Sequence, residues 1–195
     1  MKRTAYLLLA AFLLAATVSA TAQNTPRRYG VKSGIIKVIA STAGVDTPET
    51  MYFDDYGRKE SVVFTTEIPG VVKYDSWVIT IGDKSYGVSV TEGKRNYGKP
   101  SDNPMADLTF IDPSPEVIAK YNIKELGEEK FLGRTCKKIS YEATQGRNRL
   151  TYNVLVYKGI ILKSETQIRK RAVSIVATEL QENVAVPASA FQIQD

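Results

Sequence analysis

The side chains that most often do chemistry in proteins are scarce in this sequence. None of its 195 residues is a histidine, which is the commonest general base and zinc ligand and a partner in most nucleophile pairs. The acids Asp54, Asp55 and Asp112 stand beside Gly57 and Pro113, where acids usually form turns. The first two also lack the alternating ligands and the final Glu of a calcium loop. We therefore expect no catalytic site, no metal site and no cofactor.

Cys136 is the only cysteine, so the chain cannot form an internal disulfide. It lies in the segment Arg134–Ile139, whose pattern is typical of a strand, and a free cysteine in a strand behaves as a small buried hydrophobe. The neighbouring Lys137 and Lys138 would lower the pKa of an exposed thiol. We expect a buried, structural cysteine rather than a reactive one.

The N-terminus has the three parts of a secretory signal peptide. Lys2 and Arg3 precede an apolar stretch from Tyr6 to Ala16, and Ala20-Thr21-Ala22 is an A-x-A cleavage signal. The apolar stretch is shorter than the roughly 20 residues that span a bilayer. We expect residues 1–22 to be removed and residues 23–195 to form one periplasmic or secreted domain without a stable membrane anchor.

The charge of the chain does not indicate a nucleic-acid partner. Loss of Lys2 and Arg3 with the signal peptide lowers the formal net charge from +5 to +3. Basic residues cluster only briefly, at 27–28, 94–95 and 169–171, whereas a nucleic-acid footprint needs a denser stripe. We interpret these clusters as solvated surface.

The rest of the chain is a succession of strand patterns separated by turns. Gly82-Asp83 is a Gly-first pair suited to a type II′ hairpin turn, and Tyr86, Val88 and Val90 show the period-two alternation of a strand. Strands joined by such turns form an antiparallel meander. The expected strands cover residues 30–40, 49–54, 58–66, 72–81, 84–91, 135–144, 149–157, 160–168 and 172–180.

Residues 93–113 predict a long irregular connection that leads into a short helix. Ser114 is placed as N-cap, Pro115 as the first helical residue, and Glu116 near the positive helix end. Val117, Ile118 and Tyr121 would form the apolar face, and Asn122 would end the helix. The fold class is therefore mainly β, with one or two short helices.

Several strands are apolar on both faces at their centres, at 35–36 and 38–39, 77–79, 154–156 and 175–177. An antiparallel sheet with one face in water would alternate. One short helix is too small to cover so large a sheet. Either the sheet curls into a barrel or half-barrel, or residues 93–124 help to cover it, or a ligand completes its interior. In the alternative without a ligand, the loop and helix close the core fully and leave no cavity.

Three segments resemble parts of the LolA/LolB-like superfamily of envelope proteins, which includes the outer-membrane lipoprotein carriers. Leu126–Lys138 contains the pattern G-x-E-x-hydrophobic-x-G that leads into a central strand in these proteins. Val156–Glu165 resembles their following hairpin, and Val186–Ile193 resembles their closing segment P-x-x-x-F-x-hydrophobic. The resemblance covers roughly residues 115–193. The carriers begin with a helix that helps to cover the concave face, whereas Gln23–Gly34 shows no helical pattern.

The resemblance implies a strongly curved antiparallel sheet whose concave side receives an apolar or amphipathic ligand, such as an acyl chain or a lipoprotein. We expect a non-enzymatic binding or carrier protein. The alternative is a structural or interaction module of the cell envelope that binds a protein partner. Strand phase gives the candidate ligand-binding residues Phe64, Trp77, Tyr86, Tyr152 and Val154.

Overall fold

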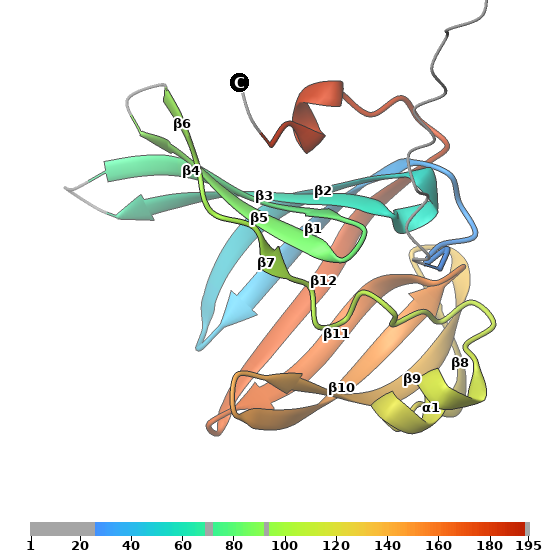
Figure 1. Cartoon of the computed structure of the whole chain (residues 1–195). Helices are drawn as coiled ribbons and strands as arrows, with labels where there is room; N and C mark the ends of the chain where they lie inside the picture. The colour runs from blue at the N-terminus through green and yellow to red at the C-terminus, as the bar shows by residue number, and fades with distance from the viewer. Residues whose placement is uncertain (1–25, 69–71, 92–93, 194–195) are drawn as a thin grey trace, which may run out of the picture.

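The computed structural model describes residues 26–68, 72–91 and 94–193, which form one antiparallel sheet with little helix (Figure 1). The predicted signal peptide lies outside these residues. In the sheet the strands follow the order β6-β5-β4-β3-β2-β1-β12-β11-β10-β9-β8, and β7 pairs with β5. The elements of the described part are β1 (Gly34–Thr42), β2 (Val45–Asp54), η1 (Asp55–Gly57), β3 (Lys59–Ile68), β4 (Val72–Ile81), β5 (Lys84–Thr91), β6 (Lys94–Tyr97), β7 (Ser101–Asp102), α1 (Pro115–Tyr121), β8 (Lys124–Phe131), β9 (Arg134–Gln145), β10 (Asn148–Tyr157), β11 (Ile160–Ile168), β12 (Arg171–Glu182) and η2 (Ala188–Phe191).

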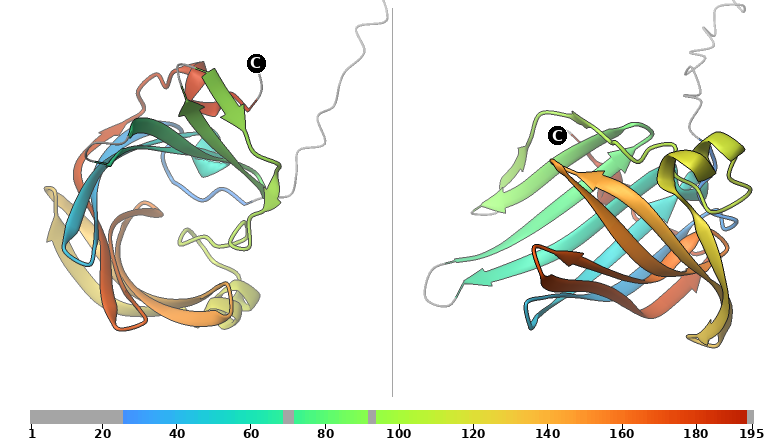
Figure 2. Two further views of the ribbon diagram at one scale, coloured as in Figure 1. Left: turned by 90° about the vertical axis from the view of Figure 1, so that its left-hand side faces the viewer. Right: turned by 90° about the horizontal axis from the view of Figure 1, so that it is seen from below.

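The sheet curls into a half-barrel that stays open between its two edges (Figure 2). The first and last long strands, β1 and β12, pair with each other at the centre of the sheet. The outer strands β6 and β8 have a sheet neighbour on one side only. In the described part of the chain, no helix has the length and apolar character needed to cross a membrane. The mainly β class and the strongly curved antiparallel sheet are both confirmed.

Most local predictions are confirmed as well. The expected hairpins form, and Gly82 has a φ of +60°, the sign that a type II′ turn requires at this position. Helix α1 begins at Pro115, the Ser114 hydroxyl accepts a hydrogen bond from the Val117 amide at 3.3 Å, and Asn122 ends the helix in the left-handed conformation. Strand β2 begins at Val45, four residues before the predicted strand.

Three strands were not predicted. β6 and β7 lie in the segment expected to be irregular, where Gly98 and Pro100 separate two short pairings. β8 has no recognisable strand pattern, because its sequence KELGEEKF is charged and almost wholly exposed. A bulge at Gly127 also interrupts its register with β9. Lysine, glutamate and a bulge are typical of an edge strand. The segment Leu126–Lys138, which was expected to lead into a central strand, instead leads into β9 next to the edge of the sheet.

Cross-strand register divides the side chains between two faces, since directly paired residues point the same way. Ile36, Val38 and Phe53 share a face and pack in one core with Leu162 and Leu180 from strands across the half-barrel. Only the concave face can bring these strands together. The opposite, convex face carries Ile79 and Val88 of β4 and β5.

Three segments outside the long strands cover this sheet. Residues 26–33, an irregular segment, lie inside the curve, and the connection 103–113 with α1 packs on the concave side of β9 and β10 (Figure 2). The C-terminal turn η2 instead contacts β3 and β4 from outside. The concave and convex faces of the sheet are therefore both partly covered. Such cover is expected for strands that are apolar on both sides.

Candidate functional site

The turns of the antiparallel meander alternate between the two ends of the half-barrel. The hairpins β2–β3, β8–β9 and β10–β11 turn at one end, where residues 26–33 fill the interior. We call this the plugged end. The hairpins β1–β2, β3–β4, β9–β10 and β11–β12 turn at the other, which we call the open end. The two ends have opposite characters, and the candidate site lies toward the open one.

Residues 26–33, which we call the plug, are held in place by main-chain hydrogen bonds. The amides of Arg28 and Tyr29 donate to the Tyr56 carbonyl at 2.9 and 3.0 Å, and the Gly30 amide donates to the Lys158 carbonyl at 2.9 Å. Gly159 has a φ of +82°, and an added Cβ there would lie 2.2 Å from the Arg28 carbonyl oxygen. Only glycine tolerates both the conformation and the close approach.

Side chains of the plug meet one carboxylate on the concave face. Glu60 accepts hydrogen bonds from the guanidinium of Arg28 and the hydroxyl of Tyr29, and the Tyr29 ring packs edge-on against Phe53 at 5.0 Å. Burial raises the pKa of Tyr29, and the Glu60 charge raises it further. Burial alone would lower the pKa of Arg28, but the same carboxylate more than offsets this and holds it above its ordinary value. The trio is a buried, paired set of charges that closes this end.

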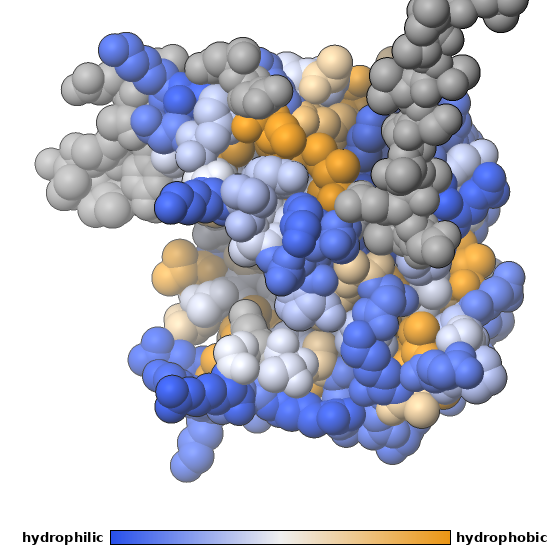
Figure 3. Space-filling view, viewed as in Figure 1, coloured by the Kyte–Doolittle hydropathy of each residue, from blue (hydrophilic) through white to orange (hydrophobic). Residues whose placement is uncertain are grey.

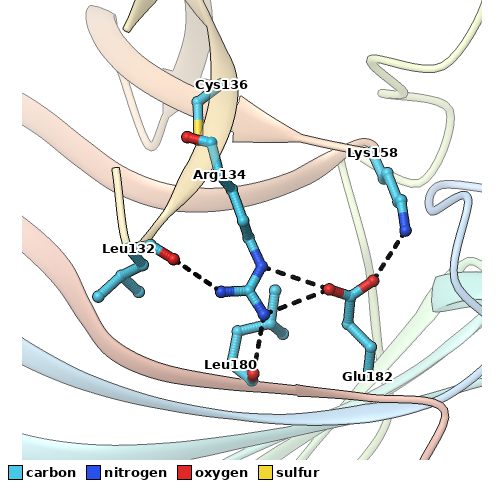
Figure 4. A network of polar contacts seen from close by, with 6 residues as sticks. All are labelled: Leu132, Arg134, Cys136, Lys158, Leu180 and Glu182. Atoms are coloured by element: carbon cyan, nitrogen blue, oxygen red, sulfur yellow. Dashed lines mark hydrogen bonds and ion pairs between the residues drawn. The ribbon is translucent and has the colours of Figure 1, made fainter. Parts of the chain in front are cut away.

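A second network joins β9 and β12 with the β8–β9 and β10–β11 turns at the plugged end (Figure 4). The Arg134 guanidinium donates to the Glu182 carboxylate at 3.3 Å and to the carbonyls of Leu132 and Leu180 at 2.9 and 3.2 Å. Lys158 donates to the second Glu182 oxygen at 2.9 Å. Desolvation of Glu182 opposes ionisation, yet Lys158 and Arg134 keep the pKa of the carboxyl below its ordinary value. These groups are engaged with one another and form structure rather than a reactive site.

Beyond the plug, the concave face carries exposed apolar side chains among hydroxyl-bearing ones such as Thr47 and Ser76. Val45, Val78 and Ile175 are 67%, 44% and 41% exposed, and register places all three on the concave side. Figure 3 shows the molecule hollowed there, between β2–β5 above and β10–β12 below, with hydrophobic residues among those at its border. We call this surface the apolar wall. It consists of Ala40, Val45, Val62, Phe64, Val78, Val173 and Ile175.

A groove of about 490 Å³ runs along part of this wall. Its lining includes Phe64, Val78, Gly87 and Asn96, which share the concave face of β3–β6. The convex-face residues Trp77, Val88 and Tyr97 also contribute to the lining. Gly87 has no side chain, and a Cβ added there would meet nothing within 4 Å, so the groove is open above it.

One carboxyl group interrupts the apolar wall. Glu49 pairs with Val38 and Phe64 and therefore points to the concave side. Desolvation raises the pKa of Glu49. No ion-pair or hydrogen-bond partner for its side chain occurs among the residues that the structure describes.

The five residues predicted to bind a ligand do not all lie together. Phe64, Tyr152 and Val154 are on the concave face, but Val154 is buried beneath α1 and the 105–110 segment, and Tyr152 stacks on Tyr141 at 5.0 Å. Trp77 and Tyr86 are on the convex face, where Arg95 lies over the Trp77 ring at 5.2 Å. Ligand contact by these five residues stays a prediction, and the geometry supports Phe64 best.

Sequence reasoning missed most of the apolar wall. Val78 and Ile175 stood in the doubly apolar segments, but which of their two faces is concave depends on pairing across the sheet. Cys136, by contrast, is buried as expected, and burial raises the pKa of its thiol. Within the described ranges, no group of three or more His, Cys, Asp or Glu side chains could hold a metal ion.

No family profile and no curated protein matches the sequence. Solved structures do match the fold. An uncharacterised conserved protein from Thermus thermophilus superposes with a TM-score of 0.52 at 11% identity, and the match covers 83% of this chain and 85% of that one. A putative outer membrane lipoprotein-sorting domain from Vibrio parahaemolyticus is similar over 85% of this chain and 91% of its own, with 13% identity and a TM-score of 0.40. The match to the Thermus thermophilus protein shows a shared fold.

A structure of the MucA/MucB complex of Pseudomonas aeruginosa is also similar, with a TM-score of 0.49 and 13% identity. The alignment covers 82% of the present chain but only 55% of the matched one, so this chain spans about half of that protein. At such identities the likeness concerns the fold alone.

Proposed function

We propose that this protein is a non-enzymatic carrier that binds an apolar or amphipathic molecule against the apolar wall, outside the cytoplasm. The observation that carries the proposal is the exposure of Val45, Val78 and Ile175 on one concave surface that leads into a groove. Contiguous exposed apolar surface is rare on soluble proteins unless something binds there. A concave shape favours a small ligand, because it can surround the ligand on several sides.

The size of the groove suits an acyl chain. Burying a methylene group contributes about 0.8 kcal/mol, so ten methylenes contribute roughly 8 kcal/mol before ordering costs. That amount is sufficient for micromolar binding. Because the plugged end is filled by residues 26–33, the chain would enter from the open end or from the gap between the sheet edges.

The test is a titration of delipidated protein with a fluorescent fatty acid, in the wild type and in a Val78→Thr/Ile175→Thr double variant. Threonine keeps the branched shape of the strand residues but adds a hydroxyl to the wall. We expect the double variant to bind at least about tenfold more weakly, since it loses apolar contact worth roughly 25 cal/mol per Å². Ile118→Thr is the matched control, because Ile118 is also 41% exposed but lies on α1. Equal binding by all three proteins would contradict the proposal.

One observation favours the alternative of a protein-binding module. Strand β8 has a sheet neighbour on one side only, and its Leu126 is 57% exposed. Such an edge can accept an extended peptide as an added strand. A Leu126→Lys variant would impair peptide binding at β8 and leave fatty-acid binding unchanged, so the two functions can be tested separately.

The location outside the cytoplasm rests on the predicted signal peptide. Intact-mass analysis of the envelope fraction should find a chain that starts at Gln23. A full-length chain retained in the cytoplasm would exclude this part of the proposal.

A further inference from the structure

The open end carries a set of exposed basic residues next to the apolar wall. Arg147 lies in the β9–β10 turn, Arg169 and Lys170 lie in the β11–β12 turn, and Lys94 and Arg171 begin β6 and β12. We call these five residues the cationic rim. None of them has an ion-pair partner in the part of the chain that the structure describes.

Two members of the rim belong to the concave face. Arg171 pairs with Ile168 and stands two residues before Val173 and four before Ile175, so it shares their side of β12. Lys94 pairs with Thr91 on β5 and stands two residues before Asn96, which lines the groove. The apolar wall thus has a cation at its outer limit on two different strands.

The described acidic side chains at this end do not neutralise the rim. Asp46 and Asp75 lie on the convex face by register, where they accept hydrogen bonds from Ser41 and Thr65 at 2.5 and 2.7 Å. At the plugged end some cations are paired, as in Lys84 with Asp102 and Lys158 with Glu182. The rim therefore presents unpaired positive charge where the concave face opens.

The single carboxyl group of the apolar wall lies deeper than the rim. Glu49 is four residues from the start of β2, about 13 Å along the strand from Val45 at 3.3 Å per residue. A ligand that entered with an anionic group leading would bring that group toward Glu49. The same ligand with its chain leading would leave the anionic group beside Arg171 and Lys94.

From this polarity we infer that the carrier takes amphiphiles with an anionic headgroup, a carboxylate or a phosphate, and holds the headgroup at the cationic rim with the chain on the apolar wall. This inference rests on the proposed function and specifies its ligand class. Charge complementarity of this kind affects both the selectivity and the rate of binding. Because the rim is exposed, its contribution should weaken as salt is added.

The experiment compares ligands that have the same sixteen-carbon chain. The delipidated protein, residues 23–195, is titrated at low ionic strength with palmitate, lysophosphatidylglycerol, lysophosphatidylcholine and hexadecyltrimethylammonium. Each ligand is kept below its critical micelle concentration. We expect the two anionic ligands to bind about tenfold more tightly than the zwitterionic one, and the cationic ligand to bind most weakly. The preference should shrink at 0.5 M salt.

The rim is tested with a Lys94→Gln/Arg169→Gln/Arg171→Gln variant. We expect it to bind lysophosphatidylcholine as the wild type does and to lose most of the preference for the anionic ligands. The control is Lys59→Gln/Lys130→Gln, which removes two exposed cations at the plugged end and should keep the preference. Melting temperatures of all variants show whether each remains folded.

The outcomes separate the two proposals. Failure of every ligand to bind would overturn the carrier function itself. Equal binding of all four headgroups, or a preference that survives in the rim variant, would overturn the rim inference alone. Inorganic phosphate is titrated as well, and binding of phosphate as tight as that of the lysolipid would reduce the rim to a simple anion site. Sedimentation of the protein with anionic vesicles, without uptake of monomeric lipid, would instead assign the rim to a membrane surface.

Discussion

Glu49 and Phe64 lie directly opposite each other on β2 and β3, with both side chains on the concave face. The carboxyl group is thus held beside an aromatic ring in a mostly apolar surface, and desolvation raises its pKa. A group with a raised pKa binds its proton more tightly in the folded state than in the unfolded chain. Its effect on stability therefore depends on pH.

We expect Glu49→Gln to stabilise the protein at pH 7 and to have no effect near pH 3.5. Above the pKa of the unfolded chain, the wild type loses stability as pH rises through the folded pKa, because the charged form is disfavoured in the wall. Glutamine carries no charge and avoids this loss. Thermal melts at the two pH values check the prediction, and a destabilised variant at pH 7 would show that Glu49 has a partner.

The close approach at Gly159 should make this glycine indispensable. Gly159→Ala places a Cβ 2.2 Å from the Arg28 carbonyl oxygen at a φ of +82°. We expect the free energy of unfolding to fall by at least about 3 kcal/mol, because both the plug and the backbone at residue 159 must shift. Gly44→Ala is the control: its φ is +84° but nothing lies within 4 Å of the added Cβ, so the loss should stay near 1 kcal/mol. Urea denaturation measures both, and equal losses would indicate that the contact is unimportant.

Loss of a charge in the plug should lower the free energy of unfolding more than loss of a charge on the surface. Glu60→Gln removes the carboxylate that accepts from Arg28 and Tyr29 and leaves a largely buried guanidinium without its partner. We expect a loss of about 3 kcal/mol. Glu129→Gln breaks the exposed pair with Lys138 and should cost less than about 1 kcal/mol. A similar cost for both in chemical denaturation would argue against the plug as a buried electrostatic unit.

Cys136 should be inert in the folded protein. Its side chain is inaccessible, and burial raises the pKa of the thiol, so little thiolate is present at neutral pH. We expect slow labelling by a thiol reagent under native conditions and rapid labelling in denaturant. Cys136→Ala should cost about 1–2 kcal/mol, as expected for a small truncation in a core. Fast native labelling would disprove the burial.

The local signals in the sequence were sufficient for the hairpins and for α1, because turn glycines and the Ser114 cap act over a few residues. They were insufficient for β8, where the edge position favours charges that conceal the strand pattern. The candidate site was harder still. Trp77 and Val78 are adjacent in a strand that is apolar on both sides, and the choice of the concave face depends on β2, β3 and β5 as neighbours. Strand phase can place Trp77 and Tyr86 on the same face, as observed, but it cannot say which face curves inward.

The pairing of β1 with β12 also determines how the chain folds. Apart from the short β5–β7 ladder, every other ladder of the described sheet joins consecutive strands, so the segments 34–97 and 124–182 can each grow by adding hairpins. The seam at Gly34–Thr42 requires closure of a loop that includes most of the protein. Contacts between distant parts of a chain form slowly, because the entropy of loop closure is lost before they are gained. Each half would then wait, partly folded and with its apolar side uncovered, until the seam forms, and that interval is when aggregation competes most strongly with folding.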